Sequence, residues 1–219
     1  MHFHIITLFP QSFDSYLGES ILKRALEDKK IKVSFYNPRD FADNKWKRID
    51  RPPYGGGPGL VIEAEPVIKA IAKAKGKNEA KIIFLSPSGK QFTNEYATKT
   101  AKKFKNIIII CGRYEGIDAR VKKVFKMDEV SVGPFVLTGG ELPALVIIDV
   151  VARQVPGVLG NLDSIEERRI ASSEVYTRPE VFEYPTPGRG KKGKKYRVPR
   201  ILLSGHKAKI EEWKRKRRK

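Results

Sequence analysis

A glycine-framed loop between an apolar strand pattern and an apolar helix pattern restricts the fold of this chain more than any other feature. Residues 133–145 read Gly-Pro-Phe-Val-Leu-Thr-Gly-Gly-Glu-Leu-Pro-Ala-Leu. The glycines allow positive φ and a close approach of the backbone to a ligand, and Pro143 suits the first turn of a helix. Residues 112–116 and 54–59 form two further glycine-dense loops. Together, the three loops predict one flat ligand that is held largely by backbone atoms.

Apolar runs alternate with amphipathic stretches along most of the chain. The spacing predicts strands over residues 3–8, 32–36, 80–85, 106–111 and 128–132. It predicts helices over residues 13–26, 65–75, 94–104 and 141–153, with a short helix after Asp118. The first helix would bury one face, made of Phe13, Leu17, Ile21 and Ala25. The last helix is apolar nearly all round and would be buried. This alternation predicts an α/β fold with a mostly parallel sheet and helices on both faces.

Three of the predicted loops begin where a strand ends, at residues 86–89, 112–116 and 133–140. Ligands of such sheets bind beyond the carboxyl ends of the strands. We therefore expect these loops to converge on one site.

The net charge of +19 is unevenly distributed. Residues 189–219 carry 15 Lys and Arg against 2 Glu, whereas the preceding part has an excess of only 6 positive charges. We predict a globular domain over residues 1–160, a flexible linker over 161–173 and a small, mainly helical, basic module over 174–219. Ser204 would cap the last helix. The basic module would face a polyanion, although a solvated tail that maintains solubility is an equal alternative.

Several other classes of protein receive little support. The lone Cys111 ends an apolar run, which predicts a buried thiol and a reducing compartment. Neither a leader nor an apolar run of membrane-spanning length is evident, so we expect a cytoplasmic protein. Residues 188–195 spell most of a P-loop but end in Lys195 and follow no strand. The histidines are scattered and lack zinc-ligand spacing.

Four charged residues could have either a structural or a functional role. Asp149 and Arg153 are four residues apart on the apolar helix, where an ion pair is common. A charge near the core is costly unless it has a purpose, so a functional role for Arg153 is equally supported. Glu115 and Asp118 follow Cys111 and could either line a site or cap a helix.

Six motifs occur in the order found in one family. They are Pro-Tyr-Gly-Gly-Gly-Pro-Gly (53–59), Gly-Arg-Tyr-Glu-Gly-Ile-Asp (112–118), Val-Leu-Thr-Gly-Gly-Glu-Leu-Pro (136–143), Val-Pro-Gly-Val-Leu-Gly (155–160), Tyr-Thr-Arg-Pro (176–179) and Leu-Ser-Gly-His (203–206). Across nearly its whole length, the chain resembles the bacterial-type tRNA (guanine-N1)-methyltransferases of the SPOUT class.

The resemblance implies an enzyme that uses S-adenosylmethionine to methylate N1 of the guanosine immediately 3′ of the anticodon. It also implies a deep trefoil knot beneath the cofactor and a homodimer with active sites at the subunit interface. Its partner would be tRNA, with no membrane, and a requirement for Mg²⁺ is left open.

The resemblance also assigns residues. Asp163 would be the general base, and Arg153 would support the guanine. The cofactor would be bound by Pro87, Gly112, Tyr114, Glu115, Gly116, Val132, Gly133, Leu137, Gly139 and Gly140. The tRNA would be bound by Tyr54, Gly55, Gly56, Gly57, Arg178, Ser204 and His206. The chain offers no motif for a tightly bound metal.

The chain departs from the family pattern at three places. Pro134-Phe135 replaces an Asp-Tyr pair, which removes a polar group near the cofactor. The segment after Asp163 reads Glu-Glu-Arg-Arg-Ile from position 166, in place of a short stretch that contains glycine and leucine. The insertion at 183–196 is long and basic and is expected either to contact phosphates or to be disordered.

Two rival functions are considered. The first is a non-catalytic RNA-binding protein on the same scaffold, for which the basic tail would suffice. The second is another SPOUT methyltransferase that acts on ribosomal RNA or on a ribose hydroxyl. The intact glycine loops count against the first rival, and the loop at 54–59 counts against the second.

Overall fold

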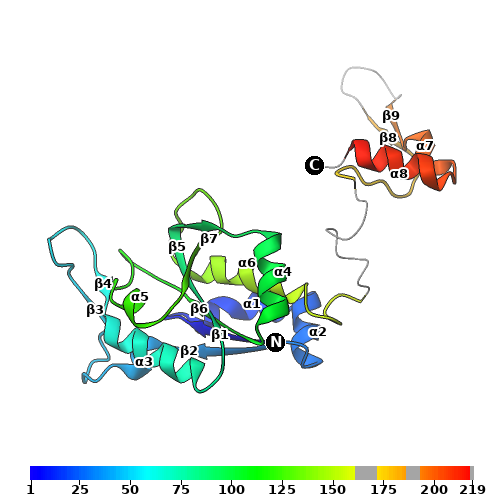
Figure 1. The fold of residues 1–219 in the computed structure, drawn as a ribbon. Helices are drawn as coiled ribbons and strands as arrows, with labels where there is room; N and C mark the ends of the chain where they lie inside the picture. The colour runs from blue at the N-terminus through cyan, green and yellow to red at the C-terminus, as the bar shows by residue number, and fades with distance from the viewer. Residues whose placement is uncertain (161–171, 186–192, 218–219) are drawn as a thin grey trace. The chain divides into compact units, whose positions relative to one another are not determined.

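The computed structural model describes residues 1–160, 172–185 and 193–217. The chain divides into two compact units, Met1–Leu162 and Asp163–Lys219, and each is described by itself (Figure 1). All but two residues of the predicted linker at 161–173 lie outside the described residues.

A five-stranded sheet forms the centre of the first unit (Figure 1). Its order is β2-β1-β6-β5-β7, and every neighbouring pair is parallel. The strands are β1 (His2–Ile6), β2 (Lys32–Tyr36), β5 (Lys81–Gln91), β6 (Asn106–Ile110) and β7 (Asp128–Ser131). The predicted mixed α/β fold with a parallel sheet is therefore confirmed.

Both faces of this sheet are covered because its central strands are apolar on both sides. On β6, Ile107 and Ile109 join one core cluster, and Ile108 and Ile110 join the other. The first cluster includes residues of α1 (Asp14–Leu17), α2 (Ser20–Glu27), α4 (Asn94–Lys103) and α6 (Glu141–Ala152). The second includes residues of α3 (Ala64–Lys75) and α5 (Val121–Val124). Cys111 is buried and free, as predicted.

The prediction of one continuous helix over residues 13–26 is wrong. A 3₁₀ turn (η1, Pro10–Phe13) leads into α1, and α2 starts only at Ser20. Gly18 closes α1 by donating its N–H to the carbonyl of Asp14, and Ser20 has a φ of 53°. This break rotates the second part of the segment, so Leu22 is buried where Ile21 was expected.

The loop predicted at residues 86–89 is also wrong. Strand β5 continues through it to Gln91, and its register with β7 shifts between Leu85 and Lys90. Pro87 cannot donate to the ladder, which accounts for an irregular stretch inside the strand. The residues still reach the carboxyl edge of the sheet, where the predicted site lies.

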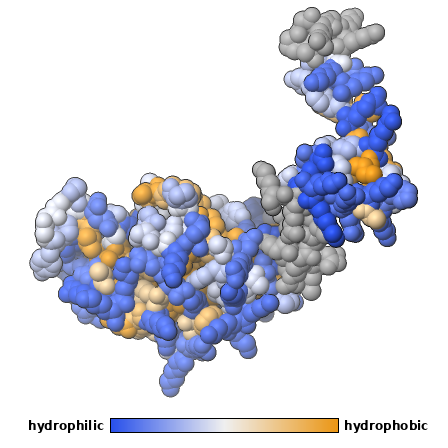
Figure 2. All heavy atoms as spheres, turned by 45° about the horizontal axis from the view of Figure 1, so that its top comes forward, coloured by the Kyte–Doolittle hydropathy of each residue, from blue (hydrophilic) through white to orange (hydrophobic). Residues whose placement is uncertain are grey.

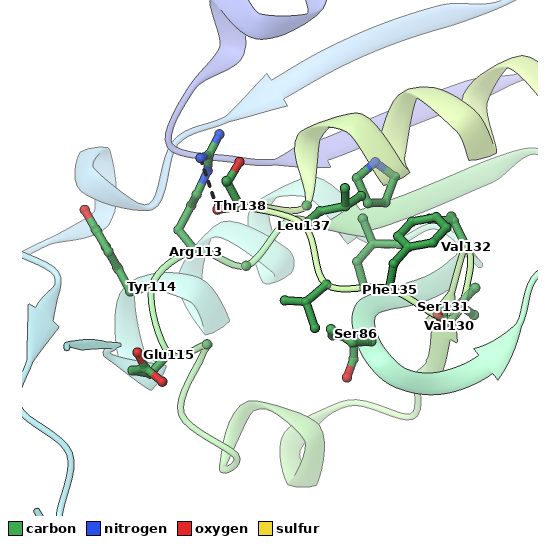
Figure 3. Close-up of a pocket in the computed structure, with 18 residues that line it drawn as sticks. Ser86, Arg113, Tyr114, Glu115, Val130, Ser131, Val132, Phe135, Leu137 and Thr138 are labelled. Atoms are coloured by element: carbon green, nitrogen blue, oxygen red, sulfur yellow. Dashed lines mark hydrogen bonds between the residues drawn. The ribbon is translucent and has the colours of Figure 1, made fainter. Parts of the chain in front are cut away.

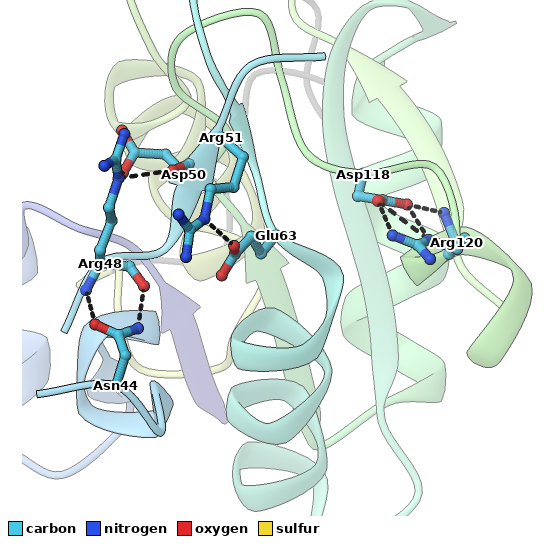
Figure 4. Close-up of polar contacts among 7 residues, drawn as sticks. All are labelled: Asn44, Arg48, Asp50, Arg51, Glu63, Asp118 and Arg120. Carbon is cyan, nitrogen blue, oxygen red and sulfur yellow. Dashed lines mark hydrogen bonds and ion pairs between the residues drawn. The ribbon is translucent and has the colours of Figure 1, made fainter. Parts of the chain in front are cut away.

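The glycine cluster at 54–59 connects two short antiparallel strands, β3 (Asp50–Arg51) and β4 (Val61–Ile62). Gly55, Gly56, Gly57 and Gly59 all have positive φ, which glycine adopts readily. Figure 4 shows how polar contacts hold the base of this hairpin. Arg51 Nε lies 2.8 Å from Glu63 Oε1. The side chain of Asn44, a residue shortly after the 3₁₀ turn η2 (Pro38–Phe41), forms hydrogen bonds with the backbone N–H and carbonyl of Arg48.

The second unit contains an antiparallel pair, β8 (Val181–Tyr184) and β9 (Lys194–Arg197), followed by α7 (Arg200–Leu203) and α8 (Lys207–Lys216). The prediction of a mainly helical module missed this strand pair. Ser204 is not the N-cap of α8: its hydroxyl donates to the carbonyl of Ile201 at the end of α7 and accepts from the N–H of His206, the residue before the helix. The residue that precedes α8 is His206, without a side-chain cap. Across the described part of the chain, no helix is both long and apolar enough to cross a membrane.

Candidate active site

A cavity of about 310 Å³ opens at the carboxyl ends of β5, β6 and β7 (Figure 3). Parallel sheets bind ligands at this edge. Nine of the ten predicted cofactor residues line the cavity, namely Pro87, Gly112, Tyr114, Glu115, Gly116, Val132, Leu137, Gly139 and Gly140. The tenth, Gly133, directly follows Val132 but does not line it. The loops at 112–116 and 133–140 thus come together as expected, and the third contribution comes from residues 85–87 inside β5 rather than from a loop.

The cavity has apolar walls and a polar backbone. Leu85, Val130, Val132 and Phe135 form its apolar side, together with Leu137 (Figure 3). On the other side, the loop at 112–116 passes along the cavity, and Tyr114 has a φ of 58°, which is uncommon for a residue other than glycine. Such walls suit a flat aromatic group between apolar side chains, with backbone groups available for hydrogen bonds.

Gly140 holds the two principal loops against each other. Its N–H donates to the carbonyl of Gly112 at 3.0 Å. A Cβ at this position would lie only 2.6 Å from the Cα of Cys111. Only glycine therefore fits here without moving the backbone. This contact fixes the start of α6 beneath the end of β6.

A buried ion pair beside the cavity was missed by the sequence reasoning. Arg113 Nη2 lies 2.8 Å from Glu141 Oε2, and the residue Glu141 is only 4% exposed. The hydroxyl of Thr7 donates to the other carboxylate oxygen of Glu141 at 2.8 Å. The pair is close but not aligned as a hydrogen bond, since Glu141 Oε2 has no hydrogen-bond partner in the described structure. In the sequence, Arg113 and Glu141 belong to two separate glycine-rich motifs, and nothing in those motifs indicates that the two side chains pair.

The Arg113 guanidinium also supports the loop that closes the cavity. Its Nη1 donates to the carbonyl of Thr138 at 3.2 Å (Figure 3). Its opposite contact is the ring of Phe9, 4.7 Å from the guanidinium carbon. The Arg113 side chain passes directly beneath Gly139, where a Cβ would lie 2.3 Å from Nε. Arg113 therefore joins the end of β6 to the loop before α6.

The glycine hairpin at 54–59 reaches the cavity through its base. The N–H of Glu115 donates to the carbonyl of Leu60 at 3.0 Å. A Cβ on Gly59 would meet the Glu115 carboxylate at 2.7 Å. The predicted tRNA-binding residues Tyr54, Gly55, Gly56 and Gly57 are exposed, and Tyr54 is fully so. The hairpin is thus placed to contact a molecule that enters from solvent.

The carboxylate of Asp118 binds a neighbouring arginine and is not the N-cap of a helix. Its carboxylate accepts from the backbone N–H and the guanidinium of Arg120 (Figure 4). This side-chain hydrogen bond holds the pKa of Asp118 below its usual value. Residue Arg120, not Asp118, is the N-cap of α5. The capping reading of Asp118 is therefore wrong.

Arg153 lies at the other end of α6 from the cavity. It is half-buried and follows Ala152, whereas Gly140 and Pro143 line the cavity at the start of the helix. Twelve helical residues span about 18 Å, at 1.5 Å per residue. No ion pair joins Arg153 to Asp149 in the described structure, and Asp149 instead accepts a hydrogen bond from Tyr16. Arg153 is thus outside the cavity of its own chain.

The remaining predicted residues lie elsewhere. Asp163 falls outside the described residues. Arg178, Ser204 and His206 are exposed on the second unit. Within residues 1–160, 172–185 and 193–217, no group of three or more His, Cys, Asp or Glu side chains could hold a metal ion. A role for Mg²⁺ has no support from these residues.

Comparison with known proteins identifies a single family. The model for "tRNA (Guanine-1)-methyltransferase TrmD" matches residues 1–219. A relative from Clostridioides difficile is 44% identical over 98% of this chain and 91% of its own length. One from Citrifermentans bemidjiense is 46% identical over 99% of this chain and 84% of its own. Both relatives are named tRNA (guanine-N(1)-)-methyltransferase.

Proposed function

The chain belongs to the tRNA (guanine-1)-methyltransferase family, and we propose that its target is N1 of the guanosine immediately 3′ of the anticodon. Methylation of guanine N1 in tRNA is the activity for which its relatives are named. The observation that carries the proposal is the cavity at the carboxyl edge of the sheet, lined by nine of the ten residues assigned to the methyl donor.

The residues of this cavity fit S-adenosylmethionine, the methyl donor that the family implies. Its volume of about 310 Å³ falls within the usual range for small-molecule sites, roughly 300–1,000 Å³. Leu137 and Val132 suit the faces of an adenine, and the Glu115 carboxylate is a suitable acceptor for ribose hydroxyls. When bound, the donor supplies a methyl group on a positively charged sulfur.

The protein's part in the reaction is to position guanine and to handle its proton. Guanine N1 must lose a proton as it accepts the methyl group, and a nearby carboxylate can accept it. We assign this role to Asp163. The Arg153 guanidinium would donate to guanine O6, where negative charge develops. Holding N1 in line with the methyl group contributes further to the rate.

We further propose a homodimer in which Arg153 serves the cavity of the partner. The residue lies at the far end of α6 from its own cavity. The same helix exposes Leu142 and Val146, one turn apart, and Val136 before it is largely exposed. An exposed apolar stripe of this kind marks a protein interface. An isologous dimer through α6 would bring the end of one helix toward the cavity of the other subunit.

We also propose that the chain forms a trefoil knot beneath the cofactor and that the second unit binds tRNA. The contact of Gly140 with Gly112 is consistent with a chain that threads beneath the loop at 112–116. The second unit, with its excess of lysine and arginine, would bind tRNA together with the exposed hairpin at 54–59. Its tRNA substrate would place the enzyme in the cytoplasm.

The decisive experiment supplies the purified protein with S-adenosylmethionine carrying a labelled methyl group and with unmodified tRNA. Nucleoside analysis should find the label in 1-methylguanosine only. A tRNA with adenosine at the proposed position serves as the matched control and should remain unlabelled. Label in a ribose or in another base would contradict the proposal, and an unlabelled product would favour the non-catalytic RNA-binding alternative.

A further inference from the structure

The strand pair β8–β9 presents one aromatic face to solvent. Side chains at alternate positions of a strand share a face, so Phe182 and Tyr184 lie together. Phe182 is paired directly with Tyr196 on β9. We call the set Phe182, Tyr184 and Tyr196 the aromatic face. The strand pair lies at the ends of the insertion that distinguishes this chain from the family pattern.

The three rings form a connected surface. The centroids of Phe182 and Tyr184 are 6.3 Å apart with an angle of 29° between the planes, and those of Phe182 and Tyr196 are 6.4 Å apart. Lys194 Nζ lies 5.3 Å from the centroid of Tyr196. A cross-strand aromatic pair such as Phe182–Tyr196 stabilises the pairing of its two strands. A flat ligand would therefore meet a surface that is already arranged.

Internal packing does not account for these rings. Phe182, Tyr184 and Tyr196 are 54%, 57% and 48% exposed. The aromatic contact that supports α8 is a different one, between Tyr176 and Trp213. Most of the second unit is hydrophilic on the face shown in Figure 2. Three exposed rings on such a surface indicate a binding function.

The charge beside the rings identifies the kind of partner. Lys194 is exposed on β9 and is paired with Tyr184, which places it on the aromatic face, whereas Arg197 alternates with Tyr196 and lies on the opposite face. The single acid of the two strands, Glu183, is paired with Lys195 at 3.8 Å. This pair lies on the opposite face, because Glu183 and Lys195 alternate with the aromatic positions. Aromatic rings flanked by cations are the arrangement that binds single-stranded nucleic acid, with bases on the rings and phosphates on the cations.

We propose that the aromatic face stacks on unpaired bases of the tRNA substrate, with Lys194 contacting an adjacent phosphate. The inference rests on the proposed function for the identity of the RNA. It adds a base-contacting surface to a segment that the sequence predicted either to contact phosphates or to be disordered. RNA is favoured over a protein partner because the face is bordered by positive charge and its rings stand in the geometry of a stacking platform.

The test uses the full chain and two fluorescent RNA probes, an oligouridine and a blunt-ended, fully paired duplex whose strands have the same length. The variant Phe182→Leu/Tyr184→Leu/Tyr196→Leu keeps the charge and apolar character but removes the rings. Its affinity for oligouridine should fall roughly 10-fold or more, the loss expected for one or two stacked bases. Affinity for the paired duplex should change less than about twofold, and the salt slope should stay that of the parent.

The matched control is Glu183→Gln/Lys195→Gln, which alters the opposite face without changing the net charge and should bind both probes normally. Tyr184→Phe, which keeps the ring, should also bind both probes normally. If the triple variant does not fold, Tyr184→Leu alone replaces it in the test, and its affinity for oligouridine should fall about fivefold. Unchanged oligouridine binding, or an equal loss on both probes, would overturn the inference. Because oligouridine contains no guanine, this result is independent of whether the protein methylates tRNA.

Discussion

Arg113 and Glu141 form an ion pair of 2.8 Å between Nη2 and Oε2, in which the carboxylate is almost fully buried. The pair connects the end of β6 to the first residue of α6, and Thr7 connects the same carboxylate to the end of β1. Three segments that are distant in sequence thus share one buried charge. Their relative position defines the shape of the cavity, although Arg113 contributes only part of its lining.

Removal of the acid from this pair should destabilise the protein. Glu141→Ala leaves the Arg113 charge without its partner, and because the Arg113 side chain is 25% exposed the loss should stay below the roughly 3–5 kcal/mol typical of a fully buried charge. Urea denaturation followed by circular dichroism measures the loss. The double variant Arg113→Met/Glu141→Leu should recover part of it, because no buried charge remains. A midpoint for Glu141→Ala equal to that of the exposed-pair control Glu95→Ala would show that the ion pair does not hold the fold.

The contact between Gly140 and the backbone of Cys111 predicts a selective loss of cofactor binding. Gly140→Val would force apart the loops at 112–116 and 133–140, so S-adenosylmethionine should no longer bind in calorimetry without RNA. Gly160→Ala is the matched control, since nothing lies within 4 Å of an added Cβ there. Normal affinity in a folded Gly140→Val variant would refute the assignment of this cavity to the methyl donor.

Stability should fall in mildly acidic solution because of two histidines on β1. Burial lowers the pKa of His2 from 6.5 to about 4 and also lowers the pKa of His4, and the positive charges of Lys32 and the N-terminus act in the same direction on His2. His2 Nε2 is 2.9 Å from the hydroxyl of Ser34. The unfolded chain therefore binds protons that the folded chain does not, and stability is lost as the pH falls from about 6.5 toward 4.

The measurement is the thermal midpoint of the parent and of His2→Gln/His4→Gln between pH 7.5 and 4. The difference between the two proteins isolates the histidines from the carboxylates that also titrate in this range. The variant should lose less stability than the parent over this interval. Parallel pH profiles for the two proteins would contradict the assigned cause.

The parallel sheet could be predicted from the sequence because its strands are apolar on both faces, as in the isoleucine run of β6. The break between α1 and α2 could not, since it depends on Gly18 and on the positive φ of Ser20 rather than on hydrophobic spacing. The cavity was predictable because glycine loops follow strands. The burial of Glu141 was not, because its partner Arg113 is brought near only by the tertiary fold. The strands β8 and β9 are separated by a Pro-, Gly- and Lys-rich stretch whose composition resembles a disordered segment.

The general base is the next testable assignment. Asp163→Ala should lower the single-turnover rate of methylation roughly 10²–10⁴-fold, the usual contribution of a positioned base. Affinity for S-adenosylmethionine should stay near that of the parent, which separates a catalytic loss from a binding loss. If the rate falls less than about threefold, the role belongs to another acid, and Glu166 is the next residue to replace.

If the cavity of one subunit works with Arg153 of its partner, as we propose, then two inactive variants should complement each other in mixed dimers. Arg153→Ala removes the side chain proposed to contact guanine, and Leu137→Trp places a larger side chain at a position that lines the cavity. Each variant alone should form inactive dimers. After subunit exchange, half of the dimers would be mixed, and each would contain one intact site, so methylation should recover to roughly a quarter of the parent's activity. A mixture that forms mixed dimers yet remains inactive would show that the cavity and Arg153 act within the same chain.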